Sequence, residues 1–157
     1  MTIKILISRC FLGEKVRYDG RENAIHHNII KKWSEHGFLV PICPEVAGGL
    51  AVPRPPAEIH QETKEVFTNT NRNVTAEFQH GASIALSLCQ QHGIQFALLK
   101  ESSPSCGSML IYDGHFTGTK IKGEGVTTTL LKSAGIKVYS EKNIEILISE
   151  LDGILNK

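Results

Sequence analysis

Apolar residues along this chain alternate between two kinds of pattern. Short runs rich in β-branched and aromatic residues predict buried strands at 3–8, 38–42, 96–100 and 136–139. Between these runs apolar residues recur every three or four positions, which predicts helices at 23–36, 73–92, 125–134 and 144–155. Glycine directly follows the first three helices, as expected of helix C-termini, and the last helix is expected to end or break near Gly153.

Strands and helices therefore alternate along most of the sequence. This order predicts right-handed βαβ crossovers and a mostly parallel sheet with helices on both faces. We expect an α/β fold, a single three-layer sandwich with its functional site at the strand ends. A length of 157 residues suits one domain over 1–157.

The remaining segments are read from their turn-forming residues. The polar stretch 11–20 is expected to be a loop, and the proline-rich stretch 43–59 an ordered loop with one helical turn at 45–48. A short strand is expected at 65–70. Residues 109–117 predict a hairpin whose turn is Asp113-Gly114.

Composition narrows the function classes. The formal net charge is +1, so bulk electrostatics give no attraction to a nucleic-acid polymer or an anionic membrane. Apolar runs fall short of a membrane span, and the first residues lack the apolar core of a signal peptide. We therefore expect a cytoplasmic protein with no membrane or nucleic-acid polymer partner. The sequence does not fix the oligomeric state, and a monomer is compatible with it. Disulfides are rare in that compartment, so the four cysteines are expected to be thiols or ligands.

Three cysteines follow predicted strands. Cys10, Cys43 and Cys106 come after the first, second and third strand, and the ends of parallel strands meet at one edge of a sheet. Three thiols there suit a metal or an iron–sulfur cluster, and no pair shows the short spacing of structural zinc sites. The alternative is that they are buried thiols packed as small apolar groups. Cys89 lies in a helical pattern and is expected to be a core thiol.

Polar residues close to these cysteines are candidates for acid–base and binding roles. Glu45 lies two residues after Cys43 and suits a general base or acid, or simply the first turn of a helix. Ser102, Ser103 and Ser105 precede Cys106 around a proline, and they either point into a cleft or form an ordinary serine-rich turn.

Two further segments are candidates for substrate binding. Arg17 and Asp19 lie on the predicted loop after the first strand, where ligands are often contacted. Lys120 lies in GTKIKGEG, residues 118–125. Its glycines precede a predicted helix, where backbone N–H groups can bind a phosphate, but the segment is only a weak signal because it matches no known phosphate-binding motif. Both segments also suit plain solvated surface.

Four long segments resemble the thiouracil desulfidase (TudS) family, formerly a domain of unknown function. They are SRCFLGEKVRYDG, CPEVAGGLAVPRPPAEI, LLKESSPSCG and YDGHFTGTKIKGEGVTTTLL, and the resemblance covers nearly the whole chain. It implies an oxygen-sensitive 4Fe–4S cluster held by Cys10, Cys43 and Cys106, with one iron left open. It also implies that Glu45 and Ser103 are catalytic.

The resemblance further implies a non-redox enzyme. Its substrate would be a small thiolated uracil, nucleoside or nucleotide, and its products the oxo pyrimidine and sulfide. The substrate-binding candidates would then be Arg17, Asp19, Ser102, Ser105 and Lys120. Two alternatives stay open: a non-catalytic iron–sulfur or zinc-binding sensor module, and a metal-free enzyme with Cys43 or Cys106 as nucleophile.

Overall fold

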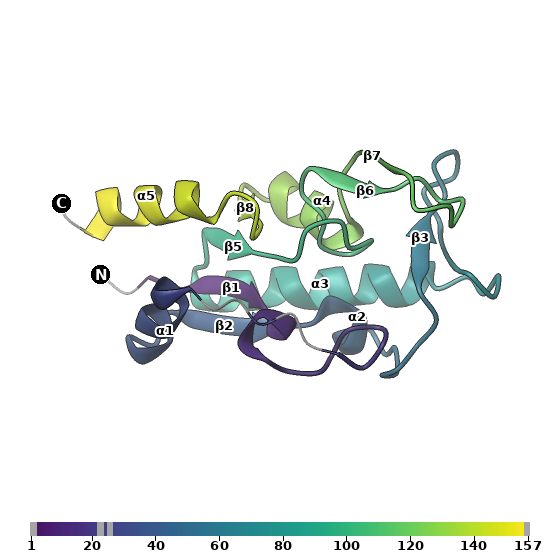
Figure 1. The fold of residues 1–157 in the computed structure, drawn as a ribbon. Helices are drawn as coiled ribbons and strands as arrows, with labels where there is room; N and C mark the ends of the chain where they lie inside the picture. Colours follow the sequence, from purple (N-terminus) through teal and green to yellow (C-terminus); the bar gives the residue numbers. More distant parts are fainter. Residues whose placement is uncertain (1–2, 22–23, 25–26, 156–157) are drawn as a thin grey trace.

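Four parallel strands form the central sheet of the protein, in the order β2-β1-β5-β8 (Figure 1). The computed structural model describes residues 3–21, 24 and 27–155. The strands are β1 (Ile5–Ser8), β2 (Leu39–Ile42), β5 (Phe96–Leu98) and β8 (Lys137–Tyr139). All four lie where the apolar runs predict strands, and β1 pairs with both β2 and β5.

Helices cover both faces of this sheet, because side chains alternate along each strand. Ile5 and Ile7 pack with residues of α1 (Asn28–Glu35) and α5 (Ile144–Leu155), whereas Leu6 packs with residues of α3 (Thr75–His92) and α4 (Val126–Ser133). The expected three-layer α/β sandwich is confirmed. None of the helices in the described ranges is long and apolar enough to cross a membrane.

Smaller elements gather beyond the ends of the strands. A 3-10 helix, η1 (Arg9–Leu12), follows β1, and the one-turn helix α2 (Pro44–Ala47) follows β2. Two antiparallel hairpins complete this end, β3 (Ala57–Ile59) with β4 (Val66–Thr68) and β6 (Leu110–Tyr112) with β7 (Lys120–Lys122). Figure 1 shows that α3 runs past the strand ends, so its first half supports this region.

The first predicted helix begins later than expected. It starts at Asn28, because His27 is extended and its Nδ1 accepts the Ile29 N–H at 3.1 Å as a cap. Ala24 is not helical, and the predicted positions 23, 25 and 26 lie outside the described residues. The last helix continues through Gly153 to Leu155, so the predicted break there is wrong. One glycine lowers helix stability by only about 1 kcal/mol, which the helix-forming residues on both sides of Gly153 can offset.

Three loop predictions also differ from the structure. The expected loop 11–20 begins inside η1, and β3 falls within the expected proline-rich loop. Asp113-Gly114 is not a two-residue turn, since β6 and β7 are joined by residues 113–119. A carboxylate oxygen of Glu58 accepts the backbone N–H groups of Gly114 and Phe116, which draws the chain into this wider loop.

Candidate functional site

A cavity of about 560 Å³ lies at the carboxyl ends of the parallel strands. Its walls come from the segments after β1, β2 and β5 and from the two hairpins. Cys10, Cys43 and Cys106 all line it. Parallel strands bring these residues to one edge although they are far apart in the sequence.

The three thiols occupy different local structures. Cys10 is buried within η1, Cys43 is the half-buried N-cap of α2, and Cys106 is buried in the loop after β5. Burial raises the pKa of the Cys106 thiol; the Ser105 hydroxyl opposes this, while negative charge on Glu45, Cys43 and Cys10 adds to it. Burial also raises the pKa of Cys43, against the effect of the Val46 backbone N–H. All four cysteines of the chain are thiols, and Cys89 lies in the core around α3.

This donor set fits an iron–sulfur cluster better than a single ion. Thiolates are the usual protein ligands of such clusters, and coordination deprotonates a thiol even where burial opposes ionisation. Among the described residues, no three His, Cys, Asp or Glu side chains converge closely enough to hold one metal ion. Cluster ligands bind separate irons across a larger body, and three thiols around an open cavity suit that arrangement.

Glu45 lies in the same cavity and is held by a buried arginine. Nε of Arg54 donates to Oε1 of Glu45 at 3.1 Å, and the two side chains are only 7% and 15% exposed. The Arg54 guanidinium also donates to the carbonyl oxygens of Ala51 and Val16. One carboxylate oxygen of Glu45 is therefore fixed, and the other faces the serines.

The serines form a short hydrogen-bonded chain that ends on Glu45. Ser105 Oγ donates to Oε2 of Glu45 at 2.9 Å and lies 2.9 Å from Ser103 Oγ. Ser103 Oγ accepts the backbone N–H groups of Ser105 and Cys106 and lies 3.4 Å from Oε2 of Glu45. Since each hydroxyl carries one proton, the shortest contacts run from Ser103 through Ser105 to Glu45.

A second carboxylate shapes the loop that carries these serines. Glu101 is only 4% exposed, and its Oε1 accepts backbone N–H groups from Ser102, Ser108, Met109 and Leu110 at 3.0–3.2 Å. Burial alone would raise the pKa of this carboxyl, but the N–H groups of Met109, Leu110 and Ser102 outweigh it and lower the pKa to about 2. The charged carboxylate thus folds the segment 102–110 around itself.

Helix α2, which carries Cys43 and Glu45, rests directly on α3. A Cβ added at Gly81 of α3 would overlap the carbonyl oxygen of Pro44, and one added at Gly48 would overlap that of Glu77. Neither glycine has a positive φ, so the need for glycine is the close approach of two backbones. The position of α2 is therefore set by α3.

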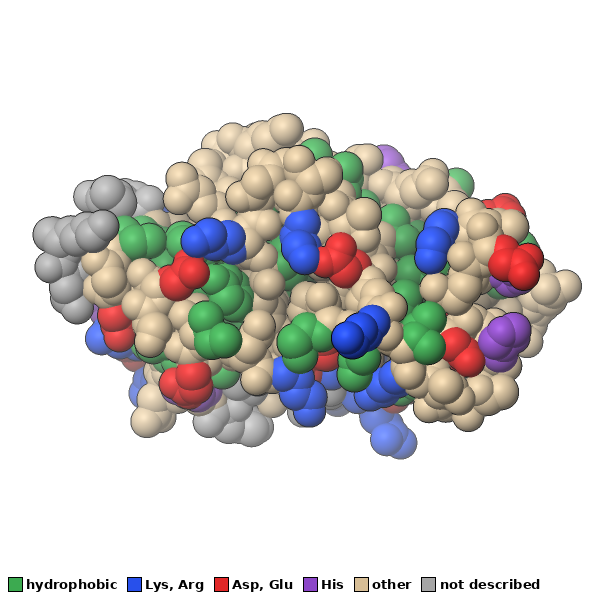
Figure 2. Space-filling view, turned by 90° about the horizontal axis from the view of Figure 1, so that it is seen from above, with side chains coloured by type: hydrophobic (Ala, Val, Ile, Leu, Met, Phe, Trp, Pro, Cys, Tyr) green, Lys and Arg blue, Asp and Glu red, His purple; other side chains and the backbone are tan. Residues whose placement is uncertain are grey.

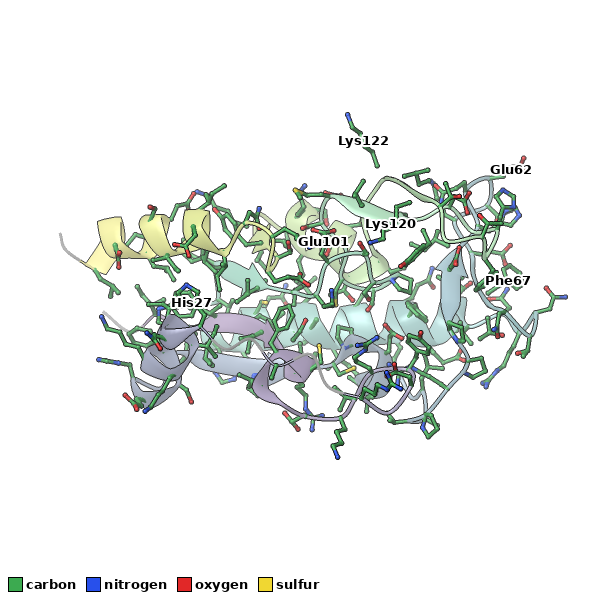
Figure 3. The ribbon with its side chains drawn as sticks, viewed as in Figure 1. His27, Glu62, Phe67, Glu101, Lys120 and Lys122 are labelled. Atoms are coloured by element: carbon green, nitrogen blue, oxygen red, sulfur yellow. The ribbon has the colours of Figure 1, made fainter. Side chains whose placement is uncertain are left out.

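The structure separates the predicted substrate-binding residues. Arg17, Ser102, Ser105 and Lys120 line the cavity, as do Glu45 and Ser103. Asp19 is not among the lining residues; it forms an ion pair with Arg17 at 3.4 Å and accepts the Arg21 N–H. Figure 3 shows Lys120 on the inner side of its hairpin and Lys122 extending away from the protein.

Four residues of this region are absent from the sequence-based candidates. Arg54 holds Glu45, Glu101 holds the serine loop, Glu58 holds the 113–119 loop, and Phe116 lines the cavity. A signal existed for Glu101, which directly follows a buried strand run. The others act through contacts distant in sequence and carried no local signal.

Charges of both signs are mixed on the face of the protein that is seen from above. Figure 2 shows basic, acidic and apolar side chains interspersed on the face seen from above. This agrees with the formal net charge of +1.

Comparison with known proteins identifies close relatives. Residues 5–143 match the family described as 2-thiouracil desulfurase. The chain is 39% identical over 152 residues to an uncharacterized protein of Bacillus subtilis (strain 168), YbbK, covering 92% of this chain and 99% of that one. It is 49% identical to a solved structure of the [4Fe-4S]-dependent thiouracil desulfidase TudS, with a TM-score of 0.92 over 96% of this chain and 98% of the other.

Proposed function

Because the chain belongs to the 2-thiouracil desulfurase family, we propose that it is a 4Fe–4S-dependent desulfidase of small thiolated uracils. The substrate is thiouracil or its nucleoside or nucleotide. Water supplies the oxygen of the carbonyl that replaces the thiocarbonyl, and sulfur leaves as sulfide, so no oxidant or reductant is needed. The observation that carries this proposal is the gathering of three thiols, Glu45 and the serine hydroxyls on one cavity.

Cys10, Cys43 and Cys106 are the residues that would hold the cluster. Bound by three thiolates, such a cluster supplies a Lewis-acidic, thiophilic iron without a protein ligand. A thiocarbonyl carbon polarised in this way would be open to attack by water. Four thiols and a cluster of this kind suit a reducing compartment such as the cytoplasm.

Glu45 is proposed as the group that accepts the proton. Its Oε1 is held by Arg54, so Oε2 is the atom that takes a proton from the attacking water. Ser105 donates to this oxygen, and Ser103 leads toward it, so a proton can pass along the two hydroxyls. Ser103, less buried than Ser105, is proposed to turn its one proton from Ser105 toward charge developing on the substrate.

Substrate contacts are proposed for the polar lining of the cavity. Ser102 presents a left-handed backbone with φ of 66° beside the serines, and Arg17 and Lys120 supply positive charge at the walls. Asp19 would act through Arg17 by fixing its guanidinium. These groups suit an electron-rich base or its substituents better than a nucleic-acid polymer, given the formal net charge of +1.

The test is an anaerobic assay of the cluster-reconstituted protein with 2- and 4-thiolated uracils, uridines and uridylates. Loss of the thione absorbance with matching sulfide release is the expected result for at least one of them. Glu45→Ala should abolish turnover while keeping the cluster. Glu124→Gln, which changes an ion pair with Lys132 outside the cavity, should keep both turnover and the cluster.

The same variants decide between an enzyme and a sensor module. A non-catalytic iron–sulfur or zinc protein would show no turnover in the wild type, and Glu45→Ala would leave its metal-dependent behaviour unchanged. Multiple turnovers that release one sulfide per thione consumed, and that require Glu45, reject that alternative.

A further inference from the structure

Phe116 has a backbone conformation that its side chain does not favour. Its φ is 56°, in the left-handed region, and the flanking positive-φ positions of the same loop are Gly114 and Gly118. Glycine adopts this region without steric cost, whereas a bulky residue there is an outlier. Such conformations persist where the surrounding structure imposes them, and they cluster at functional sites.

Glu58 imposes this conformation. Its Oε1 accepts the Gly114 N–H at 3.0 Å and the Phe116 N–H at 3.2 Å, so one buried carboxylate draws two backbone groups of the 113–119 loop together. A Cβ on Gly114 would also run into the carbonyl oxygen of Ile59, so this loop is seated tightly on β3. The loop that carries Phe116 is thus anchored, and the backbone position of Phe116 is fixed.

Phe116 lies on the wall of this cavity, and of a second one beside β3 and β4, and outside the core. Phe116 lines the cavity and is 38% exposed, and it is absent from the three apolar core clusters of the described residues. Tyr112 and Tyr18 line the same cavity, Tyr18 from the loop after η1. Figure 1 shows that loop and the β6–β7 hairpin on opposite sides of the region beyond the strand ends. The thiols and Glu45 thus lie in a cavity with aromatic walls.

We propose that Phe116 contacts the substrate, with its ring stacked on the pyrimidine ring, and that Glu58 is the positioning residue that holds it there. This inference rests on the proposed function, since it concerns the substrate of that same cavity. A flat heteroaromatic ring gains from stacking on an aromatic side chain whatever its substituents. Phe116 would therefore favour thiolated rings over non-planar thiocarbonyl compounds and leave the sulfur to the far end of the cavity.

The test compares Phe116→Ala, Phe116→Tyr and the wild type, each with its cluster reconstituted. Removing an aromatic platform weakens base binding by roughly five- to 150-fold. For a ring at the mouth of a cavity we expect the lower part of that range, roughly ten-fold, in KM for 4-thiouracil and in Kd for uracil. The value of kcat should stay within about two-fold, and Phe116→Tyr should behave as the wild type.

His115→Ala is the matched control, because His115 is exposed in the same loop and lines the second cavity but not the one that holds the thiols. It should leave KM and Kd unchanged. The inference is overturned if Phe116→Ala has the KM and Kd of the wild type, or if His115→Ala shifts them as much. Cluster absorbance, recorded for every variant, shows that the site itself is intact.

Glu58 is tested by a double-mutant cycle. Glu58→Ala should raise KM and Kd in the wild type and add little in the Phe116→Ala background, because both changes remove the same contact. Equal effects in both backgrounds would reject the positioning role.

Failure of the proposed function gives a different result. If the wild type turns over no thiolated uracil, that function is wrong, and the Kd values for uracil and 4-thiouracil still decide the role of Phe116. Weaker binding by Phe116→Ala alone supports stacking, whereas no binding by the wild type overturns both.

Discussion

Arg54 and Glu45 form a buried ion pair on the wall of the cavity, with Nε of Arg54 3.1 Å from Oε1 of Glu45. The guanidinium also bonds the carbonyl oxygens of Ala51 and Val16, so it joins Glu45 to two loops. Only an arginine can supply donors in these three directions from one rigid plane. The orientation of Glu45 is therefore already fixed by the fold.

Replacing Arg54 by lysine tests this orientation. Lysine keeps the charge and loses the planar donors, so we expect kcat for thiouracil to fall by about ten- to 100-fold while the cluster is retained. Arg72→Lys is the control, because Arg72 forms an exposed ion pair with Glu77 at 3.3 Å. Wild-type kcat in Arg54→Lys would show that the guanidinium does not position Glu45.

Alanine at each of the cysteines tests the ligand assignment. Cys10→Ala, Cys43→Ala and Cys106→Ala should each lose most of the bound iron after anaerobic reconstitution, measured as iron and sulfide per chain. Cys89→Ala removes a buried thiol from the α3 core and should keep the full iron content. Full cluster content in any of the first three variants would remove that residue from the ligand set.

Gly81→Ala tests the seat of α2 on α3. The added methyl group meets the Pro44 carbonyl and must push α2 outward, at a cost of about 1–3 kcal/mol in the free energy of unfolding. Displacing α2 moves Cys43 and Glu45, so iron content and kcat should both fall.

Gly153→Ala is the matched control for that change. A Cβ at Gly153 meets nothing within 4 Å, and the residue lies inside α5. Alanine there should stabilise the protein by about 1 kcal/mol, since glycine is the poorer helix former. Urea unfolding followed through the buried Trp33 measures both variants; equal stabilities would contradict the close packing of α2.

Glu101 predicts a specific loss of stability in acid. Its folded pKa of about 2 lies below the ordinary 4.5, so the ionised carboxylate favours the folded state. This contribution, about 3 kcal/mol, is complete above pH 4.5 and is lost as the pH falls from about 4.5 to about 2.

Glu101→Gln removes the titrating group and should be less stable than the wild type at neutral pH. The difference should shrink across that acid window, as measured by urea unfolding at a series of pH values. A constant difference between the two proteins from pH 7 to pH 3 would show that the charge of Glu101 does not hold the loop.

The sequence predicts the layers of the fold because those elements are stabilised by burial along their own length. Ile5 to Ile7 and Phe96 to Leu98 are apolar runs that must be covered, and the family match confirms the resemblance drawn from four motifs. Strands β3 and β7 were missed because β3 directly follows a run of prolines and β7 is a lysine-rich segment between glycines, so neither has a strand-like pattern of its own. No local pattern marks such a pairing.

The candidate site follows the same division. Strand ends place Cys10, Cys43 and Cys106 on one cavity, as their positions after predicted strands suggested. Hydrogen bonds between loops define the roles of three other residues, Arg54, Glu58 and Glu101. Their partners are distant in sequence and are brought close only when the chain folds. The roles of Glu45 and Ser103 stay proposals that turnover experiments decide.

The cavity draws one thiol from near the start of the chain and another from its last third. A ribosome has therefore made most of the polypeptide before Cys10 and Cys106 can face each other across the adjacent strands β1 and β5. Under the proposed ligand assignment, iron and sulfide can reach these residues only late in biogenesis.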